Sequence, residues 1–436
     1  MRPNVDTRIL ALALARMVDA LANSFLVVVL PLYIGSQLVS MPSFVGTTLP
    51  LGPVGLPLST ELLIGVVLSL FGFLNSLSQP FTGSLSDRTG RRRVFLLTGL
   101  ALVAVGSAGY LVFADYGSIL VMRALQGIGA AFTIPVTVAL VNELSGEDER
   151  GGNFGLFNTF RLLGFGTGPL VAGGVVTAGP YSVAGVELSG FDAAFLVAVV
   201  GAAVSFVLIV LLIEDPERTD SEAADDISLS VRNPDGSGLD PVFALGVATV
   251  VMALSIAMYA PLANVINEHL DQGTFLFSVQ FGATVLANVV FQYPIGRLSD
   301  RYGRRPFLVG GFVLLLPTTL AQGFVQTPGL MILARFLQGV AVAAVFAPSL
   351  ALAGDLAKAG QSGSTLSILT MGFGLGVAIG ALFSGVLVGF GFAVPFVAAT
   401  ALGAVGLFLV YTQVGETVDA DGGGGGGGGG PAPAGG

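Results

Sequence analysis

Long apolar stretches separated by short polar ones run along most of the 436-residue chain. A helix needs about 20 mainly apolar residues to cross the hydrocarbon core of a bilayer. The first half of the pattern predicts six such helices, at about 9–34, 61–83, 93–114, 117–143, 152–178 and 192–213. The second half predicts six more, at about 241–264, 275–296, 306–326, 329–354, 362–389 and 391–414. We therefore expect an all-α membrane protein with twelve transmembrane helices, the first of which is an uncleaved span.

The polar segments divide the chain into four parts. Residues 1–213 and 241–414 are expected to form two six-helix bundles. Between them, residues 214–240 include nine acidic residues and are expected to be a linker. Residues 415–436 are mostly glycine and cannot supply a hydrophobic core, so we expect a disordered tail.

The polar segment after the second predicted helix recurs in the second half of the chain. Residues 83–93 read GSLSDRTGRRR, and residues 296–306 read GRLSDRYGRRP. Arg123 and Gln126 recur as Arg335 and Gln338, at almost the same offset along the chain. Matches at one offset in several helices predict two bundles of similar structure, related by pseudo-symmetry, as in many carriers.

Composition agrees with a membrane location. The chain is 53% hydrophobic and 10% charged, against about 25% charged residues in soluble domains. There is no cysteine, which excludes disulfides, thiol chemistry and thiolate metal sites. Acidic residues outnumber basic ones, 27 to 18, and Lys358 is the one lysine. We take this excess as a sign of a host living at high salt, where negative charge is screened.

The basic residues predict the orientation. Cytoplasmic loops of membrane proteins are rich in arginine and lysine. With the N-terminus inside, 14 of the 18 basic residues fall in cytoplasmic segments, namely Arg2, Arg8, Arg88, Arg91, Arg92, Arg93, Arg150, Arg218, Arg232, Arg297, Arg301, Arg304, Arg305 and Lys358. We therefore expect a multi-pass protein of the plasma membrane, with both termini and the linker in the cytoplasm.

The motif G-x-L-x-D-R-x-G-R-R-R at residues 83–93 resembles the signature of the major facilitator superfamily, and the resemblance extends over about residues 8–414. Two helices resemble more narrowly the twelve-helix drug–proton antiporters. One contains Arg123-x-x-Gln126-Gly127, and the other is similar to the antiporter motif G-x-x-x-G-P-x-x-G-G at residues 164–173. Asp19, followed by Pro31 later in the same helix, is similar to the acidic first helix of tetracycline and multidrug exporters.

The resemblance implies a gate on the cytoplasmic side. In such a gate the two repeated segments hold the two halves of the protein together in the outward-open state. They separate when the transporter changes its conformation. The glycines are expected to allow close helix approach or tight turns. The expected members are Gly83, Asp87, Arg88, Gly90, Arg91, Arg92, Glu143, Arg150, Gly296, Asp300, Arg301, Gly303 and Arg304. The alternative is that these arginines only anchor the topology.

The resemblance also gives a role to the glycines of the fifth helix. It implies that they pack against the eighth helix, at about 275–296, and limit leakage. The residues concerned are Gly164, Gly168, Pro169 and Gly173.

Asp19 is the main candidate for coupling transport to protons. It follows Arg8 along the first predicted helix, at a distance of about 16 Å and hence near the bilayer centre. A charged carboxylate there costs roughly 2.5–3.5 kcal/mol or more unless it is paired or protonated. Asp19 is therefore expected either to exchange a proton or to form a structural bridge with Arg16, one turn earlier.

Other polar residues are expected to line a central cavity. Arg123 would act on a nearby carboxylate or receive an anionic substrate, with snorkelling to the outer interface as the alternative. Arg161, near the start of the fifth predicted helix, is expected either to face the cytoplasmic cavity or to have no such role. Two polar stripes at matched positions form either the walls of a water-filled path or helix–helix hydrogen bonds. The expected lining residues are Asn23, Asn75, Gln79, Asn264, Asn288, Gln292 and Arg335.

These patterns predict a secondary transporter rather than an enzyme. The leading interpretation is proton-coupled efflux, by antiport and alternating access, of small amphipathic or cationic organic compounds. The alternative is a symporter or uniporter of a sugar, organic acid or other metabolite, and a membrane-embedded enzyme or sensor is a remote third. We expect a monomer in the lipid bilayer, no cofactor, no nucleic-acid partner, and a proton or Na⁺ gradient as energy source. His269 is expected in a solvated outer loop rather than in a metal site.

Overall fold

The computed structural model describes residues 6–51, 54–145, 150–183, 185–215, 231–233, 238–356 and 362–417. Most of the predicted acidic linker and of the predicted tail lies outside these residues. The long helices of the first half are α1 Thr7–Gly35, α2 Thr60–Thr89, α3 Arg92–Val112, α4 Tyr116–Glu143, α5 Arg150–Ala178 and α6 Gly190–Leu212. Those of the second half are α7 Pro241–Ala257, α9 Thr274–Tyr302, α10 Arg304–Gln322, α11 Pro328–Leu356, α12 Ser362–Leu387 and α13 Val394–Gln413.

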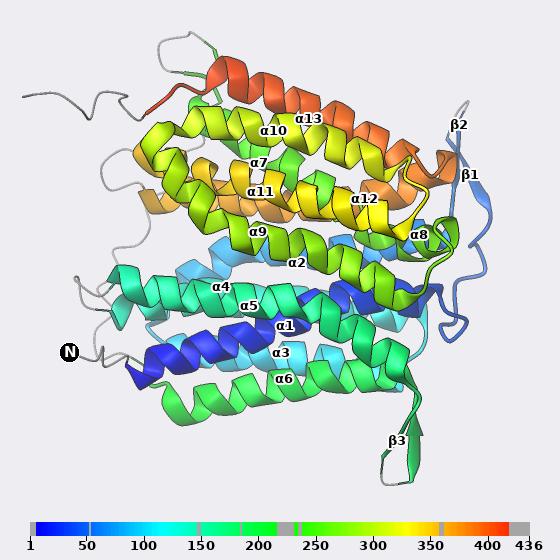
Figure 1. The fold of residues 1–436 in the computed structure, drawn as a ribbon. Coiled ribbons are helices and arrows are strands. Elements are labelled where there is room, and N and C mark those ends of the chain that lie inside the picture. The colour runs from blue at the N-terminus through cyan, green and yellow to red at the C-terminus, as the bar shows by residue number, and fades with distance from the viewer. Residues whose placement is uncertain are drawn as a thin grey trace, which may run out of the picture.

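Four short strands and three short helices complete the described fold. The strands form two antiparallel hairpins, β1 Thr48–Leu51 with β2 Val54–Pro57, and β3 Tyr181–Val183 with β4 Val186–Leu188. The short helices are η1 Ala260–Leu262, α8 Ala263–His269 and η2 Val388–Phe390. Figure 1 shows the long helices running side by side, with the hairpins at one end of the molecule. We call this the hairpin end, and the opposite end, where α2 meets α3 and α9 meets α10, the arginine end.

The predicted all-helical membrane fold is confirmed. Eleven helices of the described residues are long and apolar enough to cross a membrane. The twelfth of the predicted set, α10, has 19 residues, begins with two arginines and contains Pro317. It packs between α11 and α13 within the second half, as a sixth helix of that bundle.

Two helices extend beyond their predicted membrane spans, because hydropathy measures the membrane span and not the helix. Helices α2 and α9 continue past residues 83 and 296, through most of the repeated polar segment, to Thr89 and Tyr302. The turns themselves fall at Gly90 and Gly303, with φ of +65° and +99°, where glycine is favoured. Asp87 and Asp300 therefore lie in the last turns of helices.

The predicted end of the seventh span is also wrong. Helix α7 ends at Ala257, a single 3₁₀ turn containing Pro261 follows, and α8 continues to His269. His269 is thus the last residue of a helix rather than part of a loop, and its ring stacks on Phe392 with centroids 3.9 Å apart. Pro261 lacks the N–H that would continue the helix, which explains the break.

The glycines of α5 pack mainly against α1, which corrects the predicted contact with the eighth helix. A Cβ added at Gly164 would lie 2.0 Å from the Met17 carbonyl oxygen, and one at Gly168 would lie 2.0 Å from Ser24 Oγ. Gly173 faces α9 instead, where its Cβ would lie 2.4 Å from Ser278. Pro169 lies within α5, on its buried side.

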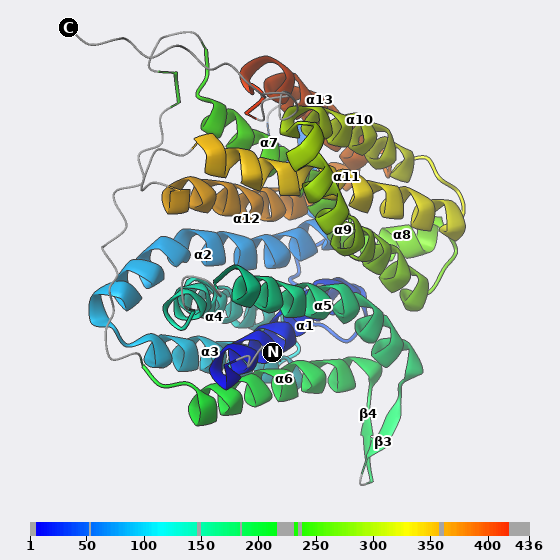
Figure 2. The same cartoon turned by 60° about the vertical axis from the view of Figure 1, so that its left-hand side comes forward.

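The second half repeats this arrangement at the equivalent positions of the repeat. Gly376 and Gly380 of α12 lie against backbone carbonyls of α7, and Gly385 lies against α2 of the first half. The two halves therefore meet along α5–α9 and α2–α12 (Figure 2).

Contacts between the halves extend to the hairpin end. A buried apolar cluster joins α1 to the second half and includes Phe25, Tyr259 and Phe277. In the same region the Asn264 amide Nδ2 donates to the carbonyl oxygen of Pro31, at 3.0 Å. The hairpin end is therefore closed by packing between the halves.

Candidate functional site

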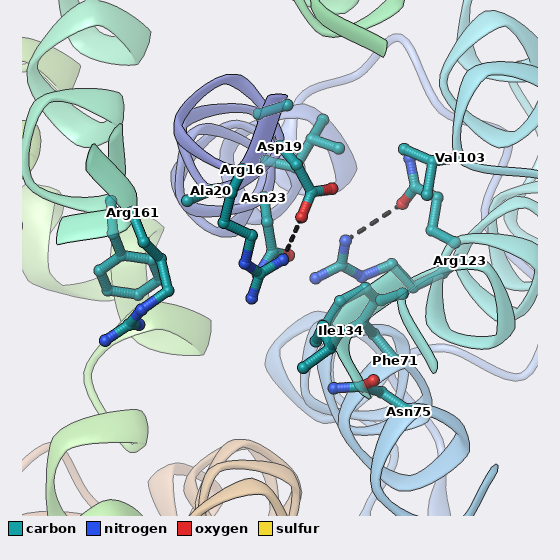
Figure 3. Close-up of a pocket in the computed structure, with 15 residues that line it drawn as sticks. Arg16, Asp19, Ala20, Asn23, Phe71, Asn75, Val103, Arg123, Ile134 and Arg161 are labelled. Atoms are coloured by element: carbon teal, nitrogen blue, oxygen red, sulfur yellow. Dashed lines mark hydrogen bonds and ion pairs between the residues drawn. The ribbon is translucent and has the colours of Figure 1, made fainter. Parts of the chain in front are cut away.

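A pocket of about 130 Å³ lies within the first half, lined from α1, α2, α3, α4 and α5. The four residues predicted to couple substrate to protons, Arg16, Asp19, Arg123 and Arg161, all line it (Figure 3). Three of the four are cationic, and Asp19 carries the one carboxylate among the described lining residues. The pocket thus places a single acidic group among three positive ones.

Asp19 forms an ion pair with Arg16, one turn earlier on α1. Both side chains are 13% exposed, so the pair is largely removed from surrounding solvent but reaches the pocket. The bond joins Arg16 Nη1 to one carboxylate oxygen, Oδ2. The ion pair that was expected as one of the two alternatives for Asp19 is therefore present.

Arg123 is anchored inside the first half and does not snorkel. Its side chain is 1% exposed, and Nη1 donates to Gln126 Oε1 at 3.1 Å. Gln126 is held in turn by Ser107 and by the Tyr110 hydroxyl. The Arg123 guanidinium lies over the ring of Phe71, 4.3 Å from its centroid. Its Nε atom is buried without a partner among the described residues.

Arg335 has nearly the same surroundings in the second half. It is fully buried, so it does not snorkel either, and Nη1 donates to Gln338 Oε1 at 2.6 Å. Gln338 donates to Thr319, the counterpart of Ser107 in the repeat. The Arg335 guanidinium lies 4.0 Å from the centroid of the Tyr259 ring. Arg335 does not line the pocket, contrary to the prediction.

Arg161 reaches the pocket from α5, across from α1 (Figure 3). Its Nε and Nη2 atoms donate to Asn158 Oδ1, at 3.0 and 2.9 Å. Asn158 was not predicted, and its one signal in the sequence is its position one turn before Arg161 on the same helix.

Of the polar residues predicted to line a cavity, some line the pocket and others lie outside it. Asn23 and Asn75 line the pocket, and Asn23 Oδ1 is buried without a partner among the described residues. Gln79 donates to Asn75 Oδ1 at 3.0 Å, a bond within α2 rather than between helices. The other predicted lining residues lie outside the pocket, namely Gln79, Asn264, Asn288 and Gln292.

At the arginine end, Arg92 ties three helices of the first half together. Its side chain is 2% exposed and pairs with Asp87 of α2 and with Glu143 of α4, the latter at 2.6 Å. In the second half Arg304 pairs with Asp300 and with Asp355. Asp355 was not predicted, although it is the counterpart of Glu143 in the repeat.

The gate differs from its prediction in two respects. Each of these ion pairs lies within one half, so in this conformation they do not hold the halves together. A Cβ at Gly83 or Gly296 would meet its nearest neighbour at 3.6 or 3.8 Å. These are ordinary contacts, so neither glycine is required here by close approach.

The remaining predicted gate arginines are peripheral. Arg88 and Arg91 are exposed and make no ion pair among the described residues. Arg301 is exposed, with its guanidinium over the Tyr302 ring. The side chain of Arg150 lies outside the described part of the structure.

A second set of contacts at the arginine end, one in each half, was not predicted from the sequence. The Arg93 backbone N–H donates to the Asp215 carboxylate just after α6, at 2.7 Å, and its guanidinium donates to the Val210 carbonyl. In the second half Arg305 makes the same contacts to Glu416, just after α13, and to the Tyr411 carbonyl. Each carboxylate thus binds the N-terminus of a helix, where anions are favoured.

The described residues contain no group of three or more histidine, cysteine, aspartate or glutamate side chains placed to hold a metal ion. This applies to the surroundings of His269 as well.

Comparison with known proteins agrees with this architecture. The family model described as Major Facilitator Superfamily matches residues 12–239 and 245–433. Citrate exporter 1 of Aspergillus niger is 30% identical over 35% of this chain and 27% of its own length. Multidrug resistance protein MdtG of Enterobacter lignolyticus is 26% identical over 64% of each chain. The chain thus spans under two thirds of the length of either relative.

Solved structures share the fold. A bacterial homologue of the human lysosomal transporter Spinster, in an inward-facing and unoccupied conformation, superposes with a TM-score of 0.74 at 12% identity. The match covers 94% of this chain and 97% of that one.

Proposed function

Because the chain belongs to the major facilitator superfamily, and is therefore a multi-pass membrane transporter rather than an enzyme, we propose that it is a proton-coupled secondary transporter that exports small organic compounds by alternating access. The observation that carries this proposal is Asp19, the one carboxylate in a pocket inside the transmembrane part of the described structure. A carboxyl group there can exist charged beside Arg16 or neutral after protonation. It therefore supplies the two states that coupling requires.

Export is supported by the names of the relatives. One is a citrate exporter and the other a multidrug resistance protein. Proton coupling, rather than coupling to Na⁺, is favoured because the single carboxylate is accompanied by arginines and not by the several oxygen ligands that a hard cation needs.

We further propose that the arginine end faces the cytoplasm of a plasma-membrane protein. The basic residues of both repeats gather at this end. In the structure the halves pack together at the hairpin end, which corresponds to an inward-facing state. The neighbour with the same fold is also inward-facing. A monomer is sufficient, because the pocket is complete within one chain.

For the substrate, the sequence predicts cationic or amphipathic compounds first and organic acids as an alternative. The charges of the pocket favour the alternative, because three arginines would repel a cation and attract a carboxylate.

The test is substrate and proton flux in vesicles reconstituted with the purified protein. Organic acids, lipophilic cations and antibiotics are supplied in turn under an imposed pH gradient. We expect substrate-dependent proton movement, and we expect its loss in Asp19→Asn. Asp271→Asn is a matched control, because Asp271 lies at the hairpin end, is exposed, and has φ of +48°, which asparagine also tolerates.

Two results would contradict the proposal. Transport that ignores the pH gradient and survives Asp19→Asn would make the Arg16–Asp19 pair structural. Transport that follows an imposed Na⁺ gradient at equal pH would identify Na⁺ as the coupling ion.

A further inference from the structure

We propose that the pocket in the first half binds a small organic anion, through Arg123 and Arg16, and that Asp19 competes with this anion for Arg16. The inference rests on the proposed function and specifies its substrate and the sign of its coupling. It follows from the charges, from the position of Arg123, and from the contact that Arg16 already makes.

The charges come first. Arg16, Arg123 and Arg161 line the pocket and carry three positive charges, against one negative charge on Asp19. An uncompensated charge is costly in a membrane interior. A bound anion would supply the missing countercharge.

Arg123 is held ready for such an anion. Gln126 fixes one end of its guanidinium and the Phe71 ring supports its face. The Nε atom remains without a partner among the described residues. A guanidinium has five N–H donors in a fork that matches a carboxylate. In Figure 3 this guanidinium points toward the Arg16–Asp19 pair, and both arginines line the same pocket, so we place the carboxylate between them.

Arg16 already binds a carboxylate, that of Asp19. Protonation of Asp19 would remove this partner and leave Arg16 to the substrate. The charged groups that line the pocket together with Asp19 are Arg16 of its own helix, which pairs with it, Arg123 of α4 and Arg161 of α5. From α2 the neighbouring lining residues are Phe71 and Asn75, from α3 Val103, and α6 has no titratable side chain beyond Asp192 at its hairpin-end terminus.

This competition determines the sign of coupling. A proton on Asp19 and an anion on Arg16 favour each other, so they bind together and cross in the same direction. A cation would instead bind the ionised Asp19 and exchange against the proton. Export of an anion would then be driven by the anion's own gradient, with a proton leaving alongside it.

The experiment is calorimetric binding to the purified full-length protein, because the chain has no tryptophan to report binding by fluorescence. The probes are citrate and benzoate, with benzamide as the neutral analogue and benzyltrimethylammonium as the cation. We expect the carboxylates to bind, more tightly at pH 5.5 than at pH 8, and the other two not to bind. These pH values are about the range in which a partly buried carboxyl can change charge.

Two arginine variants separate binding from folding. Arg123→Gln should weaken carboxylate binding about 10- to 100-fold, the loss expected for a charge-assisted hydrogen bond. Arg335→Gln is the matched control, with the same Gln contact, burial and aromatic neighbour but no place in the pocket, and should leave binding unchanged. Equal weakening by both variants would overturn the assignment.

The decisive variant is Asp19→Asn. It removes the competitor of Arg16, so carboxylates should bind more tightly than to the unmodified protein and with little dependence on pH. A misfolded variant cannot bind more tightly, so this result is specific. Weaker carboxylate binding in Asp19→Asn, or preferential binding of the cation by the unmodified protein, would overturn the inference.

The two proposals fail separately. Proton-coupled flux of a cation that depends on Asp19 would remove the anion site and leave the proposed function intact. Carboxylate binding as described, with no proton movement in vesicles, would remove the proton coupling and leave the anion site.

Discussion

Arg92 shows how a single charge holds the arginine end of the first half. It pairs with Asp87 and Glu143 while its own side chain is 2% exposed. Removing one partner of a buried ion pair leaves the others without compensation, which costs about 3–5 kcal/mol. We expect Arg92→Gln to lower the unfolding temperature of the detergent-solubilised protein markedly. This is measured by thermal unfolding followed by circular dichroism.

Arg88→Gln serves as the control for this prediction. Arg88 lies nearby in the same repeat, is exposed, and makes no ion pair among the described residues. It should change the unfolding temperature little, as is usual for surface charges. If both variants were equally stable, the Arg92 pairs would contribute nothing to folding.

At this scale the sequence predicted residue pairs better than residue environments. The spacing of Arg16 and Asp19 on one helix gave their ion pair as one of two expectations, because neighbours one turn apart are fixed by helix geometry. The depth of Arg123 in the membrane did not predict whether its side chain is buried or reaches the outer interface. Arg123 is held inside by Gln126, which is held in turn by Ser107, and Ser107 belongs to another helix. The one sign of these contacts in the sequence is the internal repeat, in which Ser107 is equivalent to Thr319 just as Arg123 is to Arg335.

Among the elements, α5 is positioned on α1 by glycine. A Cβ at Gly168 would lie 2.0 Å from Ser24 Oγ and 2.7 Å from the Leu21 carbonyl oxygen. The backbone cannot move aside as a flexible side chain can. We therefore expect Gly168→Ala to destabilise the protein by about 1–3 kcal/mol. Chemical denaturation in mixed micelles would measure the change.

The same helix contains an internal control. Gly174 has no atom within 4 Å of where a Cβ would stand. Gly174→Ala should be neutral or stabilise α5 by up to about 1 kcal/mol, since glycine weakens a helix. A loss of stability in Gly174→Ala as large as that in Gly168→Ala would mean that helix propensity, not packing on α1, sets the effect.

The pattern of glycines predicted a packing seam but not its partner. The spacing of the glycines along α5 shows which positions share a face, while the helix that occupies this face is a matter of tertiary structure. Gly164 and Gly168 face α1, and Gly173, further toward the hairpin end, faces α9. Likewise, the predicted spans stop where the hydrophilic repeat begins, yet α2 and α9 continue through most of it, to Thr89 and Tyr302.

For the whole molecule, the internal repeat predicted two bundles but could not predict which end is closed. Both halves contain the same motif at the arginine end, and the same sequence must support more than one arrangement if access alternates. What the structure adds is the contact surface along α2–α12 and α5–α9, and the closed hairpin end. Alternating access requires these surfaces to change.

This requirement can be tested by joining the halves. Ser76 of α2 and Gly374 of α12 lie opposite each other, and a Cβ at Gly374 would stand 3.4 Å from the Ser76 Cβ. Disulfides need Cβ atoms about 3.5–4.5 Å apart, and the native chain has no cysteine to interfere. We expect Ser76→Cys with Gly374→Cys to cross-link under mild oxidation and to stop transport, and reduction should restore it.

A second cysteine pair separates loss of motion from damage by the cross-link itself. Gly323 and Ala393 lie within the second half, where a Cβ at Gly323 would stand 3.3 Å from the Ala393 Cβ. This bond joins two parts of one bundle, so bundles that move as rigid bodies should continue to transport when it forms. Unchanged transport with the Ser76–Gly374 bond closed would show that α2 and α12 keep their contact throughout the cycle, and the conformational change would then have to lie within the bundles.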